Sequence, residues 1–198
     1  RSGGSSSDSY PEFAVSLTSF LQLIVRALHD ADIPFMLTGS LAAAYYGAAR
    51  ATQDVDVVIE SAPENLKRFV KAVGAAGCYV DLDTALSALQ TGGQFNVVEP
   101  TTGWKADLIV RRTRPFSVSE FDRRQHRELL GIEIGLATLE DLIIAKLEWS
   151  EMGDSELQRR DIRELVDLAG DAIDHSYLDH WIDALKLRAA WDRVSTGR

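Results

Sequence analysis

The sequence contains one cysteine, no long apolar run and no pair of histidines at a metal-binding spacing. The lone Cys78 excludes an internal disulfide and argues against a cysteine-based zinc site, so a reducing compartment, the cytoplasm, is expected. A membrane span needs about 20 apolar residues in a row, so we expect no membrane partner. The start of the chain lacks the apolar segment of a signal peptide. His175 and His180 do not have the i, i+4 spacing of helical metal ligands.

Positive charge is also scarce. The net charge of −9 argues against broad, non-specific binding of nucleic acid. The exception is the segment from Arg111 to Arg127, where six arginines outweigh Glu120 and Asp122. An acidic protein with one basic segment can hold an anionic substrate locally. The alternative is that this segment is an ordinary solvated face.

The hydrophobic pattern predicts alternating helices and strands, followed by helices alone. Helices are expected over 13–31, 39–47, 62–76 and 117–129, with a further one capped by Asp83 after a short strand at Cys78. Strands are expected over 33–38, 55–59, 92–100, 104–112 and 132–137. Three consecutive helices are expected over 138–152, 155–170 and 176–194. Thr138 and Asp141 resemble a capping box at the start of this helical part.

This order predicts an α+β fold, with a twisted mixed sheet flanked by helices and then a C-terminal helical lobe. We expect residues 1–12 to be a disordered tail or an engineered leftover. Residues 13–137 then form the α/β lobe and residues 138–198 form the helical lobe. A cleft between two such lobes is a favoured place for a ligand.

The segment "MLTGSLAAAYYGAARATQDVDVVIE" contains the first candidate site. Asp54 and Asp56 lie on one face of an apolar strand, because residues two apart on a strand point the same way. Two neighbouring carboxylates repel each other unless a cation lies between them, and Mg²⁺ prefers carboxylate oxygens together with phosphates. Ser40 opens a helix, where backbone amides attract phosphate, and Gly39 lets the backbone approach a ligand. The pattern predicts a metal and phosphate site.

A third carboxylate would complete a cage for two ions. Asp107, in the apolar strand "WKADLIV", is the best candidate. Two divalent ions can stabilise both the attacking and the leaving oxygen of a displacement at phosphorus. The alternative for Asp107 is a strand-end carboxylate paired with Lys105 or with an arginine.

Gly39-Ser40, then Asp54-Val55-Asp56, then Asp107 on a later strand resembles the nucleotidyltransferase superfamily that includes DNA polymerase beta. The resemblance implies a nucleotidyltransferase-like fold in which the Gly-Ser turn holds a nucleoside triphosphate such as ATP. It also implies that the three aspartates bind two Mg²⁺ ions, with Mn²⁺ as an alternative.

The approach "RATQDVDVVI" resembles AbiEii-like and MenT-like toxins, which places Arg50 and Thr52 beside the nucleotide. "AKLEW" and "QRRDIRELVDL" resemble the later helical motif of these toxins. On that match Lys146 contacts the phosphates, and Asp161 is the acidic residue of the motif and a candidate base for the acceptor hydroxyl. Asp167-Leu168 closes the motif. The resemblance implies an RNA acceptor, such as a tRNA 3′ end, and a cognate antitoxin as partner.

The roles given to Lys146, Asp161 and Arg50 each have a structural alternative. Lys146 could be a solvated position of an amphipathic helix, Asp161 could form a plain salt bridge with a neighbouring arginine, and Arg50 could form a structural ion pair. Trp149, together with Trp181 and Trp191, is expected in the core of the helical lobe.

The leading hypothesis is a Mg²⁺-dependent nucleotidyltransferase that moves a nucleoside monophosphate from a triphosphate to an acceptor hydroxyl. The acceptor could be RNA, a small molecule or a protein. A second hypothesis is a non-catalytic nucleotide-binding or protein-interaction module, which gains if Asp107 lies far from Asp54 and Asp56. A third is a structural protein in which the aspartate pair simply binds arginines.

Overall fold

The structure, a computed structural model, describes residues 12–153 and 155–195. The expected tail therefore lies outside the described residues, except that Glu12 already begins the first helix. The helices are α1 (Glu12–Asp30), α2 (Gly39–Tyr45), α3 (Pro63–Ala75), α4 (Leu82–Thr91), α5 (Pro115–Asp122), α6 (Leu139–Gly153), α7 (Glu156–Ala169), α8 (His175–Ala184) and α9 (Arg188–Ser195). The strands are β1 (Phe35–Thr38), β2 (Asp54–Ile59), β3 (Gln94–Val98), β4 (Lys105–Val110), β5 (Gln125–Leu129) and β6 (Ile132–Leu136). A 3₁₀ turn, η1 (Gly170–Ala172), follows α7.

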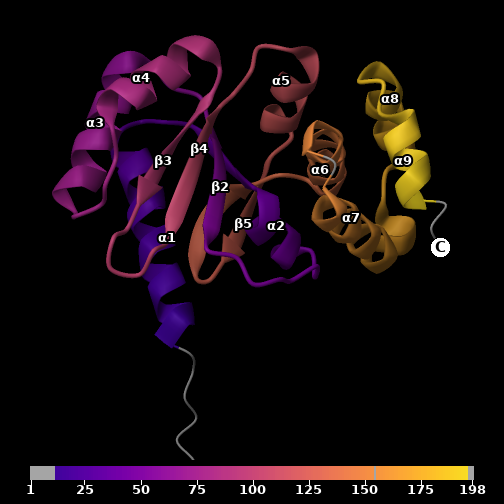
Figure 1. Cartoon of the computed structure of the whole chain (residues 1–198), viewed down its shortest axis with the longest axis horizontal. Coiled ribbons are helices and arrows are strands. Elements are labelled where there is room, and N and C mark those ends of the chain that lie inside the picture. Colours follow the sequence, from indigo (N-terminus) through magenta and orange to yellow (C-terminus); the bar gives the residue numbers. More distant parts are fainter. Residues whose placement is uncertain (1–11, 154, 196–198) are drawn as a thin grey trace, which may run out of the picture.

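The six strands form one mixed sheet in the order β3-β4-β2-β1-β6-β5. The pairs β2–β4 and β1–β6 are parallel, and the other pairs are antiparallel. Helices α3 and α4 lie on one side of the molecule and the run α6–α9 lies on the other (Figure 1). The expected α+β class, with helices flanking a mixed sheet and a helical C-terminal part, is confirmed. The lobe boundary at residue 138 stays a prediction.

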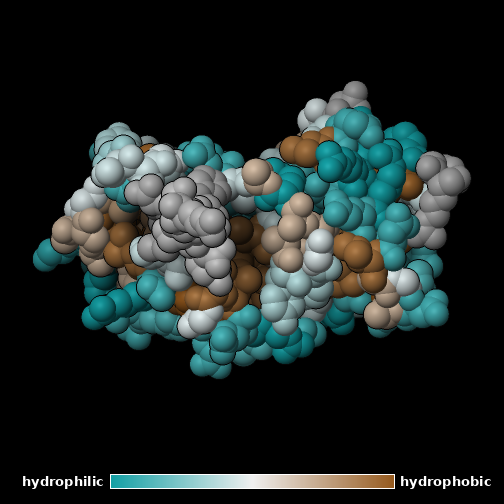
Figure 2. All heavy atoms as spheres, turned by 90° about the horizontal axis from the view of Figure 1, so that it is seen from below, coloured by the Kyte–Doolittle hydropathy of each residue, from teal (hydrophilic) through white to brown (hydrophobic). Residues whose placement is uncertain are grey.

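The core is built from one face of each amphipathic element. Apolar side chains of the sheet, of α1 and α3 and of the C-terminal helices form one continuous buried cluster. Burying apolar surface stabilises the folded state by about 25 cal/mol for each Å² removed from water. Packing in this cluster is therefore the main interaction that holds the helices on the sheet. The face seen in Figure 2 is mostly hydrophilic at its edge, and hydrophobic residues gather toward its middle. The described residues include no helix both long and apolar enough to cross a membrane.

Three local expectations were wrong. Asp81, rather than Asp83, caps α4 by accepting a hydrogen bond from the backbone of Thr84. The expected helix over 117–129 ends at Asp122, and Gln125–Leu129 forms the edge strand β5. The expected helix over 176–194 is divided into α8 and α9 by a turn in which Lys186 has a φ of +60°, a value that no helical residue adopts.

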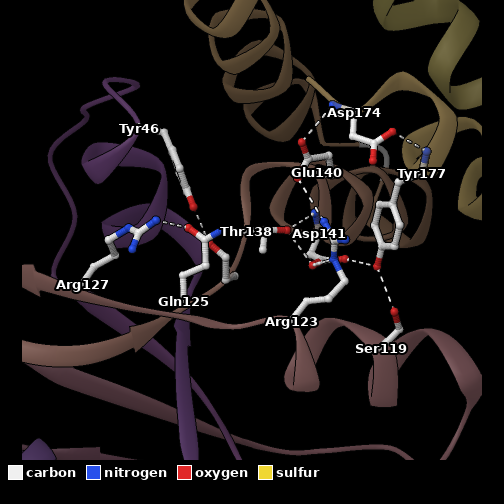
Figure 3. A network of polar contacts seen from close by, with 11 residues as sticks. Tyr46, Ser119, Arg123, Gln125, Arg127, Thr138, Glu140, Asp141, Asp174 and Tyr177 are labelled. Carbon is white, nitrogen blue, oxygen red and sulfur yellow. Dashed lines mark hydrogen bonds and ion pairs between the residues drawn. The ribbon is translucent and has the colours of Figure 1, made fainter. Parts of the chain in front are cut away.

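A buried polar network joins the sheet region to the C-terminal helices (Figure 3). Asp141, which is fully buried, accepts hydrogen bonds from the hydroxyls of Thr138 and Tyr177, each at 2.6 Å, and from Arg123. The guanidinium of Arg123 lies 3.7 Å from the ring centroid of Tyr177. Thr138 also caps α6 by accepting the backbone N–H of Asp141 at 3.3 Å. The expected cap is therefore present, and the network connects α5, α6 and α8.

Candidate functional site

Three carboxylates come together where β2 and β4 begin. The two strands pair in parallel, with Asp54 opposite Lys105 and Asp56 opposite Asp107. Residues opposite each other in a sheet point to the same face, as do residues two apart on a strand. The structure therefore places Asp54, Asp56 and Asp107 on one face, and all three line one cleft. This is the arrangement that the sequence pattern predicted.

Gly39 is packed directly against this carboxylate group. Its φ is +65°, and a Cβ added there would lie 1.9 Å from Oδ2 of Asp56. The backbone amide of Ser40 acts on the Asp56 carboxylate and lowers its pKa, against the larger opposing effects of burial and of Asp107. The Gly-Ser turn thus lies directly against Asp56. Helix α2 is also short, with seven residues, so the Ser40 hydroxyl and other groups would have to make most of any phosphate contact.

Asp56 and Asp107 repel each other in this arrangement. Burial raises the pKa of Asp56 above its usual value, and the charge of Asp107 raises it further. The Oδ1 atom of Asp107 is buried and has no hydrogen-bond partner. Buried polar atoms without a partner are rare in proteins and call for an explanation such as an ion or a ligand.

A lysine lies between two of the carboxylates. The Nζ atom of Lys105 is 3.2 Å from Oδ1 of Asp54 and 3.2 Å from Oδ2 of Asp107. The sequence-based alternative for Asp107, a pairing with Lys105, is thus present in the structure. It coexists with the grouping of Asp107 beside Asp56.

The donor set fits a divalent cation in charge and ligand type. Carboxylate oxygens are the ligands that Mg²⁺ prefers, and one Asp107 oxygen lacks a partner. In the present arrangement, however, no three His, Cys, Asp or Glu side chains within residues 12–153 and 155–195 form a group that could hold a metal ion. The ammonium of Lys105 lies between Asp54 and Asp107, where a cation shared by the two carboxylates would belong.

The other predicted residues form a second polar chain. Arg50 donates to the hydroxyl of Ser40 and, at 3.3 Å, to Asp161. Lys146 donates to the same Asp161 oxygen at 2.7 Å and to Gln158 at 3.1 Å. Lys146 and Asp161 are each only 3% exposed, so the solvated alternative for Lys146 is wrong. The ion-pair alternatives for Arg50 and Asp161 are present, although the partner of Arg50 is itself a predicted site residue.

Thr52 does not line the cleft but contacts Asp54, which does. Its hydroxyl oxygen accepts the backbone N–H of Asp54 at 3.1 Å. A threonine that holds the backbone two residues later is a common turn motif. The contact fixes the entry of the chain into β2, and thereby the position of Asp54.

The cleft has a volume of about 340 Å³. Its lining includes the predicted groups Gly39, Ser40, Arg50, Asp54, Asp56, Asp107 and Lys146. The lining also includes residues of α5 and α6 and of the loop between β4 and α5, among them Arg112, Arg114, Glu120, Glu148, Trp149 and Met152. The cleft is thus bounded by the sheet on one side and by the first C-terminal helix on the other.

Sequence reasoning missed the cleft-lining residues of α5 and of the second half of α6. Trp149 was expected in the core, but it is 47% exposed on the cleft wall, and Met152 is 70% exposed beside it. The spacing of Lys146, Trp149 and Met152 at i, i+3 and i+6 places them on one helical face and was the available signal. Glu120 is buried, and burial together with the charge of Asp141 raises its pKa to about 8. Nothing in its polar surroundings in the sequence indicated this.

The basic segment does not act as one unit. Arg111, Arg112 and Arg114 line the cleft, and Arg114 forms two bonds with Glu148 at 2.5 Å each. Arg123 is paired with Glu140 and Asp141 in the buried network. The three arginines after α5, which are Arg123, Arg124 and Arg127, are absent from the cleft wall. A continuous arginine surface over 111–127 is therefore not formed.

Comparison with protein families gives no matching family model. No curated protein matches the sequence either. The evidence from known proteins therefore rests on solved structures.

Solved structures with the same fold are found at low sequence identity. The solution structure of the antibiotic-resistance factor ANT(2'')-Ia superposes on this chain with a TM-score of 0.59 at 15% sequence identity. The match covers 93% of this chain and 100% of that one. ANT(2'')-Ia in complex with adenylyl-2''-tobramycin gives 0.54 and 12% over 91% and 98%. The lincosamide antibiotic adenylyltransferase LnuA, with lincomycin bound, gives 0.50 and 9% over 80% and 98%. With a mixed sheet followed by C-terminal helices, the chain has the same fold as these solved structures.

Proposed function

We propose that this protein is a Mg²⁺-dependent nucleotidyltransferase, which moves a nucleoside monophosphate from a triphosphate to an acceptor hydroxyl. The observation that carries the proposal is the grouping of Asp54, Asp56 and Asp107 in a cleft beside the Gly39-Ser40 turn, on a nucleotidyltransferase fold.

In the proposed reaction, the acceptor oxygen forms a bond to the α-phosphorus while the bond to pyrophosphate breaks. Two Mg²⁺ ions, or Mn²⁺ in their place, held by Asp54, Asp56 and Asp107, would offset the charge that develops on the attacking and leaving oxygens. Asp107 is the best placed proton acceptor for the hydroxyl, because one of its oxygens has no hydrogen-bond partner.

Lys146 and Arg50 supply positive charge for the phosphates. Both contact Asp161, which argues for Asp161 as a positioning residue rather than the base that the family resemblance implies. Asp161 is also buried and absent from the residues that line the cleft, so an acceptor hydroxyl bound in the cleft would not contact it. Arg50 also donates to the hydroxyl of Ser40. The contacts from Ser40 through Arg50 and Asp161 to Lys146 thus fix the groups that we assign to the phosphates.

The acceptor is best explained as a small molecule. ANT(2'')-Ia is seen with adenylyl-2''-tobramycin and LnuA with lincomycin, and here the lining of the cleft also includes Trp149, Met152 and Glu120. An RNA acceptor such as a tRNA 3′ end, with a cognate antitoxin, is the toxin-like alternative. It is less favoured, because the net charge is −9 and Arg123 is already paired with Glu140 and Asp141.

A non-catalytic nucleotide-binding or protein-interaction module is the second candidate. The observation in its favour is Lys105, which takes up oxygens of Asp54 and Asp107. The third candidate is a structural protein whose aspartates only bind arginines. Two observations argue against it: the aspartates line a cleft, and the partner of Asp54 is a lysine.

Transfer of label from α-phosphate-labelled triphosphates tests the proposal. The acceptors offered are tobramycin, lincomycin, total RNA and protein extract, with Mg²⁺ or EDTA. We expect Mg²⁺-dependent labelling of one acceptor class by wild type, loss of labelling with Asp107→Asn, and full labelling with Asp122→Asn, an exposed acid on α5. Labelling that persists in Asp107→Asn would mean that the site is misassigned. Labelling of RNA alone would favour the toxin-like alternative.

A further inference from the structure

Lys105 is the residue of this site that the proposed reaction does not use. It is the first residue of β4 and lies opposite Asp54, the first residue of β2. Asp107 follows two positions later on the same face of the strand. The lysine side chain therefore starts beside both carboxylates, and its Nζ atom lies 3.2 Å from an oxygen of each.

The ammonium offsets only part of the negative charge. It contacts Asp54 and Asp107, but no described ion pair joins it to Asp56. The second oxygen of Asp107 stays without a partner, and the charge of Asp107 still raises the pKa of Asp56. The single positive charge of Lys105 therefore does not balance the negative charge of the three carboxylates.

A divalent ion shared by Asp54 and Asp107 would compete with Lys105 for the same oxygens. An ammonium and a divalent cation repel each other strongly at contact distance, so the two cannot share this position. Lys105 is able to leave it, because its side chain is 32% exposed and a lysine has a flexible four-carbon stem with a strongly hydrated end.

We propose that Lys105 is a built-in competitor for the divalent cation, holding Asp54 and Asp107 in the metal-free protein and withdrawing when the ion binds. This inference rests on the proposed function, since it requires that the carboxylates are a metal site. It explains how Asp54 and Asp107 can lie close together when no divalent ion is bound, because each contacts the ammonium of Lys105. It also means that free metal binds weakly, and that a triphosphate, whose charge attracts both the ion and the displaced ammonium, strengthens metal binding.

Binding of Mn²⁺ alone, followed by the paramagnetic resonance signal of the free ion, tests the inference without any turnover. The variants are wild type, Lys105→Met and Lys105→Arg. Lys67→Met is the control, since the ion pair of Lys67 is with Glu64 on α3 and not with one of the three aspartates. We expect Lys105→Met to bind Mn²⁺ at least about fivefold more tightly, because the ion then has no ammonium–carboxylate contact to displace, and one such contact in a water-like dielectric is worth about that factor. Lys105→Arg and Lys67→Met should stay near wild type.

The outcomes separate this inference from the proposed function. Equal Mn²⁺ affinity in wild type and Lys105→Met, with binding lost in Asp56→Asn, would overturn the role of Lys105 and leave the metal site standing. No Mn²⁺ binding in any variant would overturn both. If Lys105→Met does not fold, Lys105→Gln replaces it. In EDTA either variant should have a lower melting temperature than wild type, and Mn²⁺ should restore it; an unchanged melting temperature would also contradict the inference.

Discussion

At the scale of single residues, the site depends on the close approach of Gly39 to Asp56. The motif indicated that a glycine is needed before Ser40, and it assigned the reason to a bound phosphate. The structure gives an additional reason, since a Cβ at Gly39 would meet the Asp56 carboxylate at 1.9 Å. The residue was predictable from the sequence, but this contact was not, because it joins a helix start to a strand reached 17 positions later in the chain.

Gly39→Ala should destabilise the protein and displace Asp56. Part of the cost is the left-handed backbone, about 1–2 kcal/mol for a residue with a Cβ. Gly103→Ala isolates that part, because Gly103 has a φ of +78° and open space around it. Urea unfolding should show a larger loss of stability for Gly39→Ala than for Gly103→Ala. Equal losses would show that the contact with Asp56 costs nothing.

The buried Glu120 makes stability depend on pH. Its pKa is raised from the usual 4.5 to about 8, so the folded protein holds this proton more tightly than the unfolded chain. The stabilisation is complete below about pH 4.5 and is lost as the pH rises toward about 8. Glu120→Gln removes this dependence. Between about pH 5 and pH 8, Glu120→Gln should therefore gain up to about 4 kcal/mol relative to wild type, at about 1.4 kcal/mol for each pKa unit.

Urea unfolding at both pH values measures the gain, with Asp122→Asn as the control on the same helix. A difference between wild type and Glu120→Gln that does not change with pH would mean that Glu120 titrates normally. The sequence could not have indicated this behaviour. The raised pKa of Glu120 comes from its burial and from the charge of Asp141, which lies on α6 and not on the helix of Glu120.

At the scale of elements, α6 and α7 are joined by one buried ion pair. Lys146 and Asp161 lie 2.7 Å apart, and Arg50 reaches the same carboxylate from the loop after α2. The family resemblance identified all three residues. It did not indicate that they contact one another, because helical periodicity fixes the face of a residue but not the partner of that face.

Removing the anion of this cluster should cost more than removing one cation. Asp161→Asn leaves Lys146 and Arg50 without their shared partner, and breaking a buried pair in this way costs about 3–5 kcal/mol. Lys146→Met leaves Asp161 paired with Arg50, so its loss should be smaller. Urea unfolding of both single variants and the double variant measures the coupling. Additive losses would mean that the pair contributes nothing beyond its separate parts.

Element boundaries were predictable where a buried face imposes a period. The strand containing Asp54 and the helix starting at Pro63 are apolar on one side, and both were placed to within two residues. Strand β5 was missed because all of its residues except Leu129 are exposed, so it has no alternating pattern. It forms through pairing with β6 across a turn at Leu130 and Gly131, both with positive φ.

At the scale of the whole molecule, the cleft exists because the C-terminal helices are held against the sheet. The network around Asp141 (Figure 3) fixes α6 and α8 to α5, and α6 carries Lys146 and Trp149 into the cleft. The α+β fold was predictable from the order of the elements. The shape of the cleft was not, since it depends on how two separately patterned parts pack together.

The central claim is that the Gly39-Ser40 turn and the three aspartates form a metal-dependent triphosphate site. Calorimetric titration of ATP, GTP, CTP and UTP, with Mg²⁺ and with EDTA, tests this most directly. The account predicts that at least one triphosphate binds wild type with Mg²⁺, that EDTA abolishes this binding, and that Asp56→Asn folds but does not bind. Absence of binding by all four triphosphates in the presence of Mg²⁺, or equal binding by Asp56→Asn, would contradict it.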